Sequence, residues 1–102
     1  MTMRTEKLGD TLLVTDIPTL TSDTSRAFKE YVHGALGPEH KVVKVDLGAA
    51  RSVDSNGLGA LISIHKTMCG RGGRVVLLHP SPLIAEMFEL LQLHKIFEII
   101  HR

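Results

Sequence analysis

Hydrophobic and polar residues alternate in short runs along the chain, and four of these runs predict β-strands. Gly9 and Asp10 form a turn signal ahead of the first run, so the chain begins like a β-hairpin. The strongest run, KVVKVDL, is rich in valine, which favours the pleated and half-buried surface of a sheet. The predicted strands are the apolar runs at 12–14, 41–47, 74–78 and 96–100.

Three longer segments have apolar residues at helical spacing. The first follows residues 21–23, which all suit a helix N-terminus, and it ends at the Gly-Pro pair 37–38. The second extends from about 57 to 69 and ends at a glycine-rich turn, and the third covers 83–93. The stripes predicted to face the core are Ala27, Phe28, Tyr31, Val32 and Ala35 in the first helix, Leu58, Leu61, Ile62 and His65 in the second, and Leu83, Ile84, Met87, Phe88 and Leu91 in the third.

The order of these elements predicts an α/β fold. Strands alternate with helices after the hairpin, an order that is typical of a partly parallel sheet. The N-terminal hairpin adds antiparallel pairing at one edge of that sheet. We therefore expect residues 1–102 to form a single domain, in which a small mixed, mostly parallel β-sheet carries packed α-helices.

The balance of charges and the short apolar runs exclude several classes of partner. Twelve basic and eleven acidic side chains give a net charge of +1, so no electrostatic footprint of a nucleic acid is visible. The apolar runs are too short for membrane insertion, and the N-terminus lacks the apolar segment of a secretory signal. Cys69 is the single cysteine, so the chain cannot form an internal disulfide framework. These features predict a cytoplasmic protein.

The segment VDSNGLGALISIHK, residues 53–66, places an acid, a hydroxyl and two glycines at the start of the second predicted helix. Asp54 and Ser55 lie where a helix has unpaired N–H groups and a partial positive charge, so either can cap the helix. Gly57 permits unusual backbone geometry, and Gly59 leaves the first turn bare for the approach of another surface. A phosphate on Ser55 would gain from the free N–H groups and would add about −1.5 to −2 charges beside Asp54.

Five motifs follow one another in about the last sixty residues. They are Asp-Leu at 46–47, Asp-Ser-Asn-Gly-Leu-Gly at 54–59, Gly-Gly at 72–73, Pro80, and Leu-x-Lys-Ile-Phe at 93–97. In this order and spacing they resemble the STAS domain family, and in particular its bacterial anti-sigma-factor antagonists. The resemblance implies the STAS fold, an α/β arrangement that agrees with the order of strands and helices.

The resemblance also implies a switch that phosphorylation operates. In such antagonists, the serine directly after the motif's aspartate is phosphorylated by a serine kinase that is also the anti-sigma factor, and by position that serine is Ser55. The unphosphorylated antagonist binds the anti-sigma factor and frees the sigma factor, phosphorylation weakens the binding, and a serine phosphatase resets the switch. The resemblance thus implies a binding module and kinase substrate, not an enzyme.

The N-terminus of the second helix is the docking surface that the resemblance implies. The family commonly has a second serine or threonine after the phosphorylated one, where this chain has Asn56. It also usually has an aspartate that contributes to kinase recognition before the first helix, where this chain has Thr21, with Asp23 two residues further on. Leu58 either begins the core stripe or contributes a partly exposed contact. The expected partner-binding residues are Asp54, Asn56, Gly57, Leu58, Thr21 and Asp23.

Three alternatives follow from the same residues. A STAS domain can act as a constitutive docking subunit of a transporter or a signalling assembly, although such relatives often lack the serine. The N-terminus of the second predicted helix favours bound anions, so it also suits a small-molecule or nucleotide sensor. Such a sensor would bind nucleotide without a protein partner. An enzyme ranks last, because no nucleophile is paired with a visible base and the Gly-x-Ser-x-Gly motif is absent.

Histidine and cysteine spacing argues against a metal site, and we expect no cofactor. None of the six histidines forms an i, i+4 pair with another histidine, and no second cysteine is present. We expect His65 to be semi-buried with a backbone partner, and Cys69 to be a buried free thiol without a nearby base. The GRGGR segment at 70–74 predicts a tight turn with solvated arginines.

Overall fold

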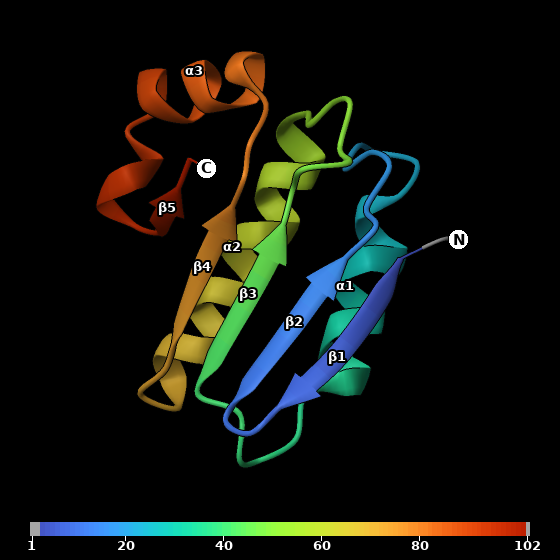
Figure 1. Cartoon of the computed structure of the whole chain (residues 1–102), viewed down its shortest axis with the longest axis vertical. Coiled ribbons are helices and arrows are strands. Elements are labelled where there is room, and N and C mark those ends of the chain that lie inside the picture. The colour runs from blue at the N-terminus through green and yellow to red at the C-terminus, as the bar shows by residue number, and fades with distance from the viewer. Residues whose placement is uncertain (1–2, 102) are drawn as a thin grey trace.

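Five strands form one sheet in the computed structural model, which describes residues 3–101. Their order across the sheet follows their order in the sequence, from β1 at one edge to β5 at the other (Figure 1). The β1 and β2 strands pair antiparallel, and every later pair is parallel, so the mostly parallel sheet with an N-terminal hairpin is confirmed. The strands are β1 (Arg4–Leu8), β2 (Thr11–Thr15), β3 (Val42–Asp46), β4 (Arg74–Leu78) and β5 (Glu98–Ile100).

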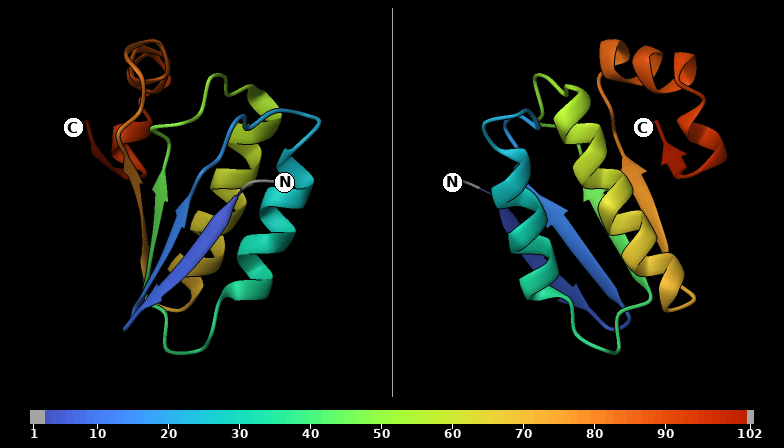
Figure 2. Two further views of the ribbon diagram at one scale, coloured as in Figure 1. Left: turned by 45° about the vertical axis from the view of Figure 1, so that its right-hand side comes forward. Right: turned by 180° about the vertical axis from the view of Figure 1, so that it is seen from behind.

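Helices α1 (Ser25–Ala35) and α2 (Ser55–Gly70) cover one face of the sheet, as the view from behind in Figure 2 shows. The register aligns Leu12, Val43 and Val75 across β2, β3 and β4, and each is at most 2% exposed. Because alternate residues of a strand point to opposite faces, the next aligned row on the same face is two residues further on. That row consists of Val14, Val45 and Leu77, and it is equally buried.

The third helix, α3 (Pro82–Leu90), lies beyond the carboxyl end of β4 and is followed by the short 3₁₀ helix η1 (Leu93–Lys95) (Figure 1). The buried residues of α3 are Ile84 and Phe88, so a small part of its surface packs against the rest of the molecule. Leu83, predicted to face the core, is 73% exposed, and Leu91 beyond the helix is 53% exposed. The prediction was wrong for these two residues, because a helix at the end of a sheet buries a narrower stripe than one lying across its face.

The three helices begin at residues other than those predicted, and the hydrogen bonds at their ends explain the differences. The first begins at Ser25, because the Thr24 hydroxyl accepts from the Thr21 N–H and donates to the Thr19 carbonyl, which holds the preceding residues in a turn. The second begins two residues early, at Ser55. The third begins at Pro82, whose missing N–H costs nothing in the first turn.

The buried faces of α1 and α2 also differ in part from the predicted stripes. In α1 only Phe28 and Val32 are buried, and Tyr31 is 42% exposed. In α2, Leu61 is buried as predicted, whereas Leu58 and Ile62 are only partly buried. His65 is half-buried, as expected. The residues of α2 that are buried against the core are Gly57, Ala60, Leu61, Ile64 and Met68, and they share Leu61 with the predicted stripe.

Candidate functional site

Two loops that are far apart in the sequence lie side by side at the start of α2. Leu20, in the loop before α1, forms a parallel bridge with Val53, in the loop before α2. The Leu20 N–H donates to the Ser52 carbonyl at 2.9 Å, and the Asp54 N–H donates to the Leu20 carbonyl at 3.1 Å. This pairing fixes the loop before α1 against the N-terminus of α2.

Asp54 caps α2 and holds the neighbouring loop at the same time. Its Oδ1 accepts the backbone N–H groups of Asn56 at 2.9 Å and Gly57 at 3.0 Å. Its Oδ2 accepts the N–H of Ser22 at 3.0 Å. These hydrogen bonds, first that from Gly57 and then those from Ser22 and Asn56, lower the pKa of Asp54, because they favour the ionised carboxylate. The capping role predicted from the sequence is therefore observed, and the link to Ser22 is additional.

Gly57 is required by close packing rather than by unusual backbone geometry. It lies in the first turn of α2, is buried, and faces the backbone of Leu20. A Cβ atom at this position would overlap the Leu20 carbonyl oxygen and would lie 2.9 Å from its Cγ. Because the obstacle is backbone, a side chain here would push the two loops apart. Gly57 is thus buried beneath the site, against the backbone of Leu20.

Ser55 is the first residue of α2, and it is exposed. It lines an open groove of about 670 Å³ between α1 and α2. The floor of the groove is bare at Gly59, where a Cβ atom would project into open space. The groove therefore leaves the Ser55 hydroxyl accessible. The residues lining it are Ser25, Arg26, Lys29 and Glu30 from α1, and Ser55, Asn56, Gly59 and Ala60 from α2.

The α1 wall of the groove carries two cations. Arg26 Nε lies 3.3 Å from Glu30 Oε2, an exposed pair one helical turn apart. Lys29 has no ion-pair partner within residues 3–101, and it is half-buried. Neither Arg26 nor Lys29 was predicted to belong to the site. Their spacing places both on the solvent side of α1, but only the packing of α1 on α2 brings them to the same groove as Ser55.

The other predicted binding residues lie around Ser55 in different environments. Asn56 is exposed in the groove, whereas Leu58 is half-buried and packs against the core. Asp23 is exposed on the turn before α1, and Thr21 in the same turn is half-buried. The hydrogen bond between Ser22 and Asp54 brings this turn to the start of α2. Thr21 and Asp23 therefore belong to the same end of the molecule as Ser55.

Cys69 differs from the sequence-based expectation in its burial, whereas His65 is half-buried as expected and differs in its partners. Cys69 is exposed, not buried, and the Nε2 atom of His65 lies 3.4 Å from its Sγ atom. The contacts of His65 are therefore with side chains: the Cys69 thiol, and the ring of Phe97 in an edge-on arrangement with centroids 5.4 Å apart. Within residues 3–101, no three histidine, cysteine, aspartate or glutamate side chains are grouped closely enough to hold a metal ion.

Both arginines of the GRGGR segment were predicted to be solvated, and the structure confirms this for one of them. Arg74 is exposed and lies 3.5 Å from Glu98 on β5. Arg71 is half-buried, and its Nη1 donates to the carbonyl of Gly37 at 2.8 Å. Arg71 therefore ties the end of α2 to the loop after α1.

The family model described as "Mlab, STAS domain" matches residues 9–100, so this chain belongs to the STAS domain family. No curated protein matches the chain in sequence. Among the helices of residues 3–101, none is long and apolar enough to cross a membrane.

Three solved structures illustrate the fold that the chain shares. A candidate anti-sigma factor antagonist from Thermotoga maritima has a TM-score of 0.86 at 21% identity, over 96% of this chain and 85% of that protein. The unphosphorylated anti-sigma factor antagonist SpoIIAA has a TM-score of 0.76 at 17% identity, over 96% of this chain and 86% of SpoIIAA. The murine anion transporter Slc26a9 has a TM-score of 0.70 at 21% identity, over 94% of this chain and 17% of the transporter. At these identities the likeness shows the fold alone.

Proposed function

We propose that this protein is an anti-sigma-factor antagonist whose binding to an anti-sigma factor with serine-kinase activity is switched off by phosphorylation of Ser55. The observation that carries the proposal is the accessible Ser55 hydroxyl in the first turn of α2, at the mouth of an open groove. The Asp54-Ser55 pair that the STAS antagonists use as a switch is present at this point. SpoIIAA, which shares the fold, has been solved in both its unphosphorylated and its phosphorylated form.

The chemistry of the site makes such a switch physically effective. Phosphorylation would place about −1.5 to −2 charges next to the ionised Asp54 carboxylate. A partner that docks on the unmodified helix end would then have to accommodate this added charge, and a buried charge that the complex does not fully pair weakens it strongly. The protein itself would keep its fold, because Ser55 is exposed and its side chain holds no hydrogen bond with the rest of residues 3–101.

Intact-mass spectrometry after incubation with ATP and a soluble extract of the native host tests the modification. We expect one added phosphate on the wild-type chain and none on Ser55→Ala. Ser25→Ala is the matched control, because Ser25 lines the same groove from α1 and is the first residue of its own helix. A phosphate that persists in Ser55→Ala, or disappears in Ser25→Ala, would contradict the assignment.

Capture experiments test the switch itself. The chain is prepared with serine or with translationally incorporated phosphoserine at position 55, and each form is used as bait in a host lysate. We expect the serine form to retain a protein with the sequence signature of a serine kinase, and the phosphoserine form to lose it. Equal retention by the two forms would rule out switching by this residue.

A second candidate is a constitutive docking subunit of a transporter. One observation favours it: the fold of this chain is also found within the anion transporter Slc26a9. In that role Ser55 would serve as part of the helix cap, and its modification state would not control binding. The capture experiment separates the two candidates, because a transporter subunit would be retained by both forms of the bait.

A further inference from the structure

His40 is the one buried polar or charged residue among residues 3–101, with an exposed fraction of 0%. It lies in the loop of residues 36–41, which connects α1 to β3 at the end of the sheet opposite Ser55 (Figures 1 and 2). The proposed function does not use this residue. A buried imidazole is noteworthy because it is the side chain that ordinarily changes charge between about pH 5 and pH 8.

The hydrogen bonds of His40 admit a single protonation state. The Gly37 N–H donates to His40 Nδ1 at 2.9 Å, so Nδ1 must carry a lone pair and not a proton. The ring is therefore neutral, with its proton on Nε2. The Nε2 atom has no hydrogen-bond partner within the described chain, since Glu39 Oε2 lies 3.7 Å away, beyond hydrogen-bond distance.

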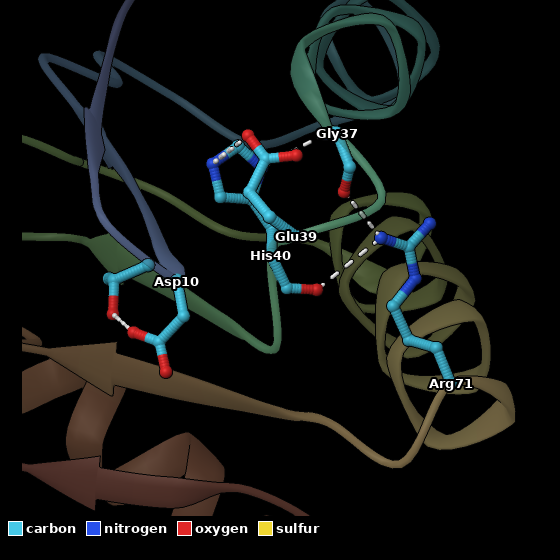
Figure 3. Close-up of polar contacts among 6 residues, drawn as sticks. Asp10, Gly37, Glu39, His40 and Arg71 are labelled. Atoms are coloured by element: carbon cyan, nitrogen blue, oxygen red, sulfur yellow. Dashed lines mark hydrogen bonds and ion pairs between the residues drawn. The ribbon is translucent and has the colours of Figure 1, made fainter.

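The charged groups around the ring come from two elements (Figure 3). Glu39, on the same loop, is the nearest carboxylate, and its side chain is 58% exposed, so water screens its attraction for a charged ring. Arg71, from the end of α2, donates from Nη1 to the carbonyl oxygens of Gly37 at 2.8 Å and His40 at 3.3 Å. Arg71 therefore binds the backbone of the loop and does not neutralise a charge on the ring.

The remaining charged side chains near this loop are already engaged elsewhere. Lys41 Nζ donates to the Arg71 carbonyl at 2.7 Å. Asp10, from the turn between β1 and β2, accepts the Thr11 hydroxyl at 3.2 Å, and its carboxylate is turned away from the imidazole (Figure 3). Neither side chain compensates a positive charge on the ring.

We propose that His40 makes the 36–41 loop a pH-sensitive latch, closed when the imidazole is neutral and open when it takes up a proton. Protonation converts Nδ1 from an acceptor into a donor, so two N–H groups would face each other where one hydrogen bond now exists. The loop must then move, or the ring must leave its buried position, and the Gly37 N–H loses its partner. Proton uptake is thereby linked to opening of the loop, because only the open loop allows both ring nitrogens to carry an N–H group.

Amide hydrogen exchange at Gly37, followed by NMR on the full chain, measures the latch directly. We expect its protection factor, corrected for the intrinsic pH dependence, to fall by about tenfold or more between about pH 7.5 and pH 5.5. In His40→Asn the side-chain oxygen can still accept from the Gly37 N–H but cannot titrate, so the protection should not change over this range. The exposed His94→Asn provides the matched control and should behave like the wild type.

Nitrogen shifts of the labelled imidazole in the wild-type chain keep the test decisive even if His40→Asn folds poorly. We expect a neutral ring with its proton on Nε2 at pH 7.5, and a loss of Gly37 protection that follows the titration of this ring. Two outcomes would overturn the proposal: a ring protonated at pH 5.5 while Gly37 stays protected, or a ring that stays neutral in the folded protein down to pH 5. Because Ser55 plays no part in these readouts, they are independent of the proposed function.

Discussion

The two ends of the sheet are built on the same plan but are exposed to water very differently. At the Ser55 end, Asp54 binds the backbone of the loop before α1, and Gly57 packs against the backbone of Leu20. At the His40 end, Arg71 binds the backbone of the 36–41 loop, and Gly73 packs against the backbone of Lys41. Each end thus joins two loops with one charged side chain and one glycine.

The two ends differ in which side chains remain accessible to solvent. The Ser55 end encloses no titratable side chain and exposes a hydroxyl, a bare glycine floor and two cations to solvent. The His40 end closes over a fully buried imidazole. A modification at the first end can therefore change the surface without changing the fold, whereas a change of charge at the second acts on the fold itself. Four substitutions test this comparison.

The largest effect is expected at Gly57. A Cβ atom there would overlap the Leu20 carbonyl oxygen, so Gly57→Ala should destabilise the protein by about 3 kcal/mol, at the upper end of the range for overpacking. Urea unfolding monitored by circular dichroism measures the change. Gly59→Ala, two residues along the same helix, has open space and should be neutral or stabilising by up to about 1 kcal/mol. Equal losses in the two variants would remove close packing as the reason for Gly57.

Gly73→Ala makes the corresponding change at the His40 end. Its Cβ atom would overlap the Lys41 carbonyl oxygen and would lie 3.0 Å from Met68 Cε, which can move aside. We expect a loss of about 2 kcal/mol in the same unfolding experiment. Gly70→Ala, which has open space at the end of α2, is the control and should not lower the stability. A Gly73→Ala protein as stable as the wild type would show that glycine packing is not equally important at the two ends of the sheet.

Arg71→Gln removes the charged side chain that binds the backbone of the 36–41 loop at the His40 end. The guanidinium donates to two backbone carbonyls and is half-buried, so its loss should cost about 2 kcal/mol. Arg74→Gln is the matched control, because Arg74 is exposed and has one carboxylate at 3.5 Å, and its loss should cost less than about 1 kcal/mol. Thermal unfolding of both variants at neutral pH ranks them. A larger loss for Arg74→Gln would contradict the role given to Arg71.

The smallest effect is expected from Asp54→Asn, which keeps one oxygen for the helix cap but removes the charge and the second oxygen, which accepts from the Ser22 N–H. Hydrogen bonds hold the pKa of Asp54 below its value in the unfolded chain. The ionised carboxylate therefore stabilises the fold above about pH 4, and this contribution is lost as the pH falls further. The melting temperature of the wild type should exceed that of Asp54→Asn at pH 6, and the gap should close toward pH 3. A gap that does not depend on pH would exclude the charge as its cause.

Local pattern was enough to predict four of the strands and the three helices, because valine-rich runs and helical spacing both reflect burial. The mostly exposed β1 was implied only by the hairpin turn at Gly9 and Asp10. Local pattern was not enough to predict where the helices begin, since Thr24 and Ser81 act through hydrogen bonds that several neighbouring hydroxyl residues could also make. The start of α2 and Ser55 could be found from the motif. The groove could not, because Arg26 and Lys29 reach it only through the packing of α1 on α2.

Leu20 and Val53 form an isolated parallel bridge beyond the ends of β2 and β3. This bridge fixes the two connecting segments relative to each other, residues 16–19 after β2 and residues 47–52 after β3. One residue inserted between β2 and Leu20, or between β3 and Val53, would shift this pairing and carry the start of α2 out of line with α1. A reporter peptide or fusion partner is better placed at the exposed Gly9-Asp10 turn, which such a shift would not reach.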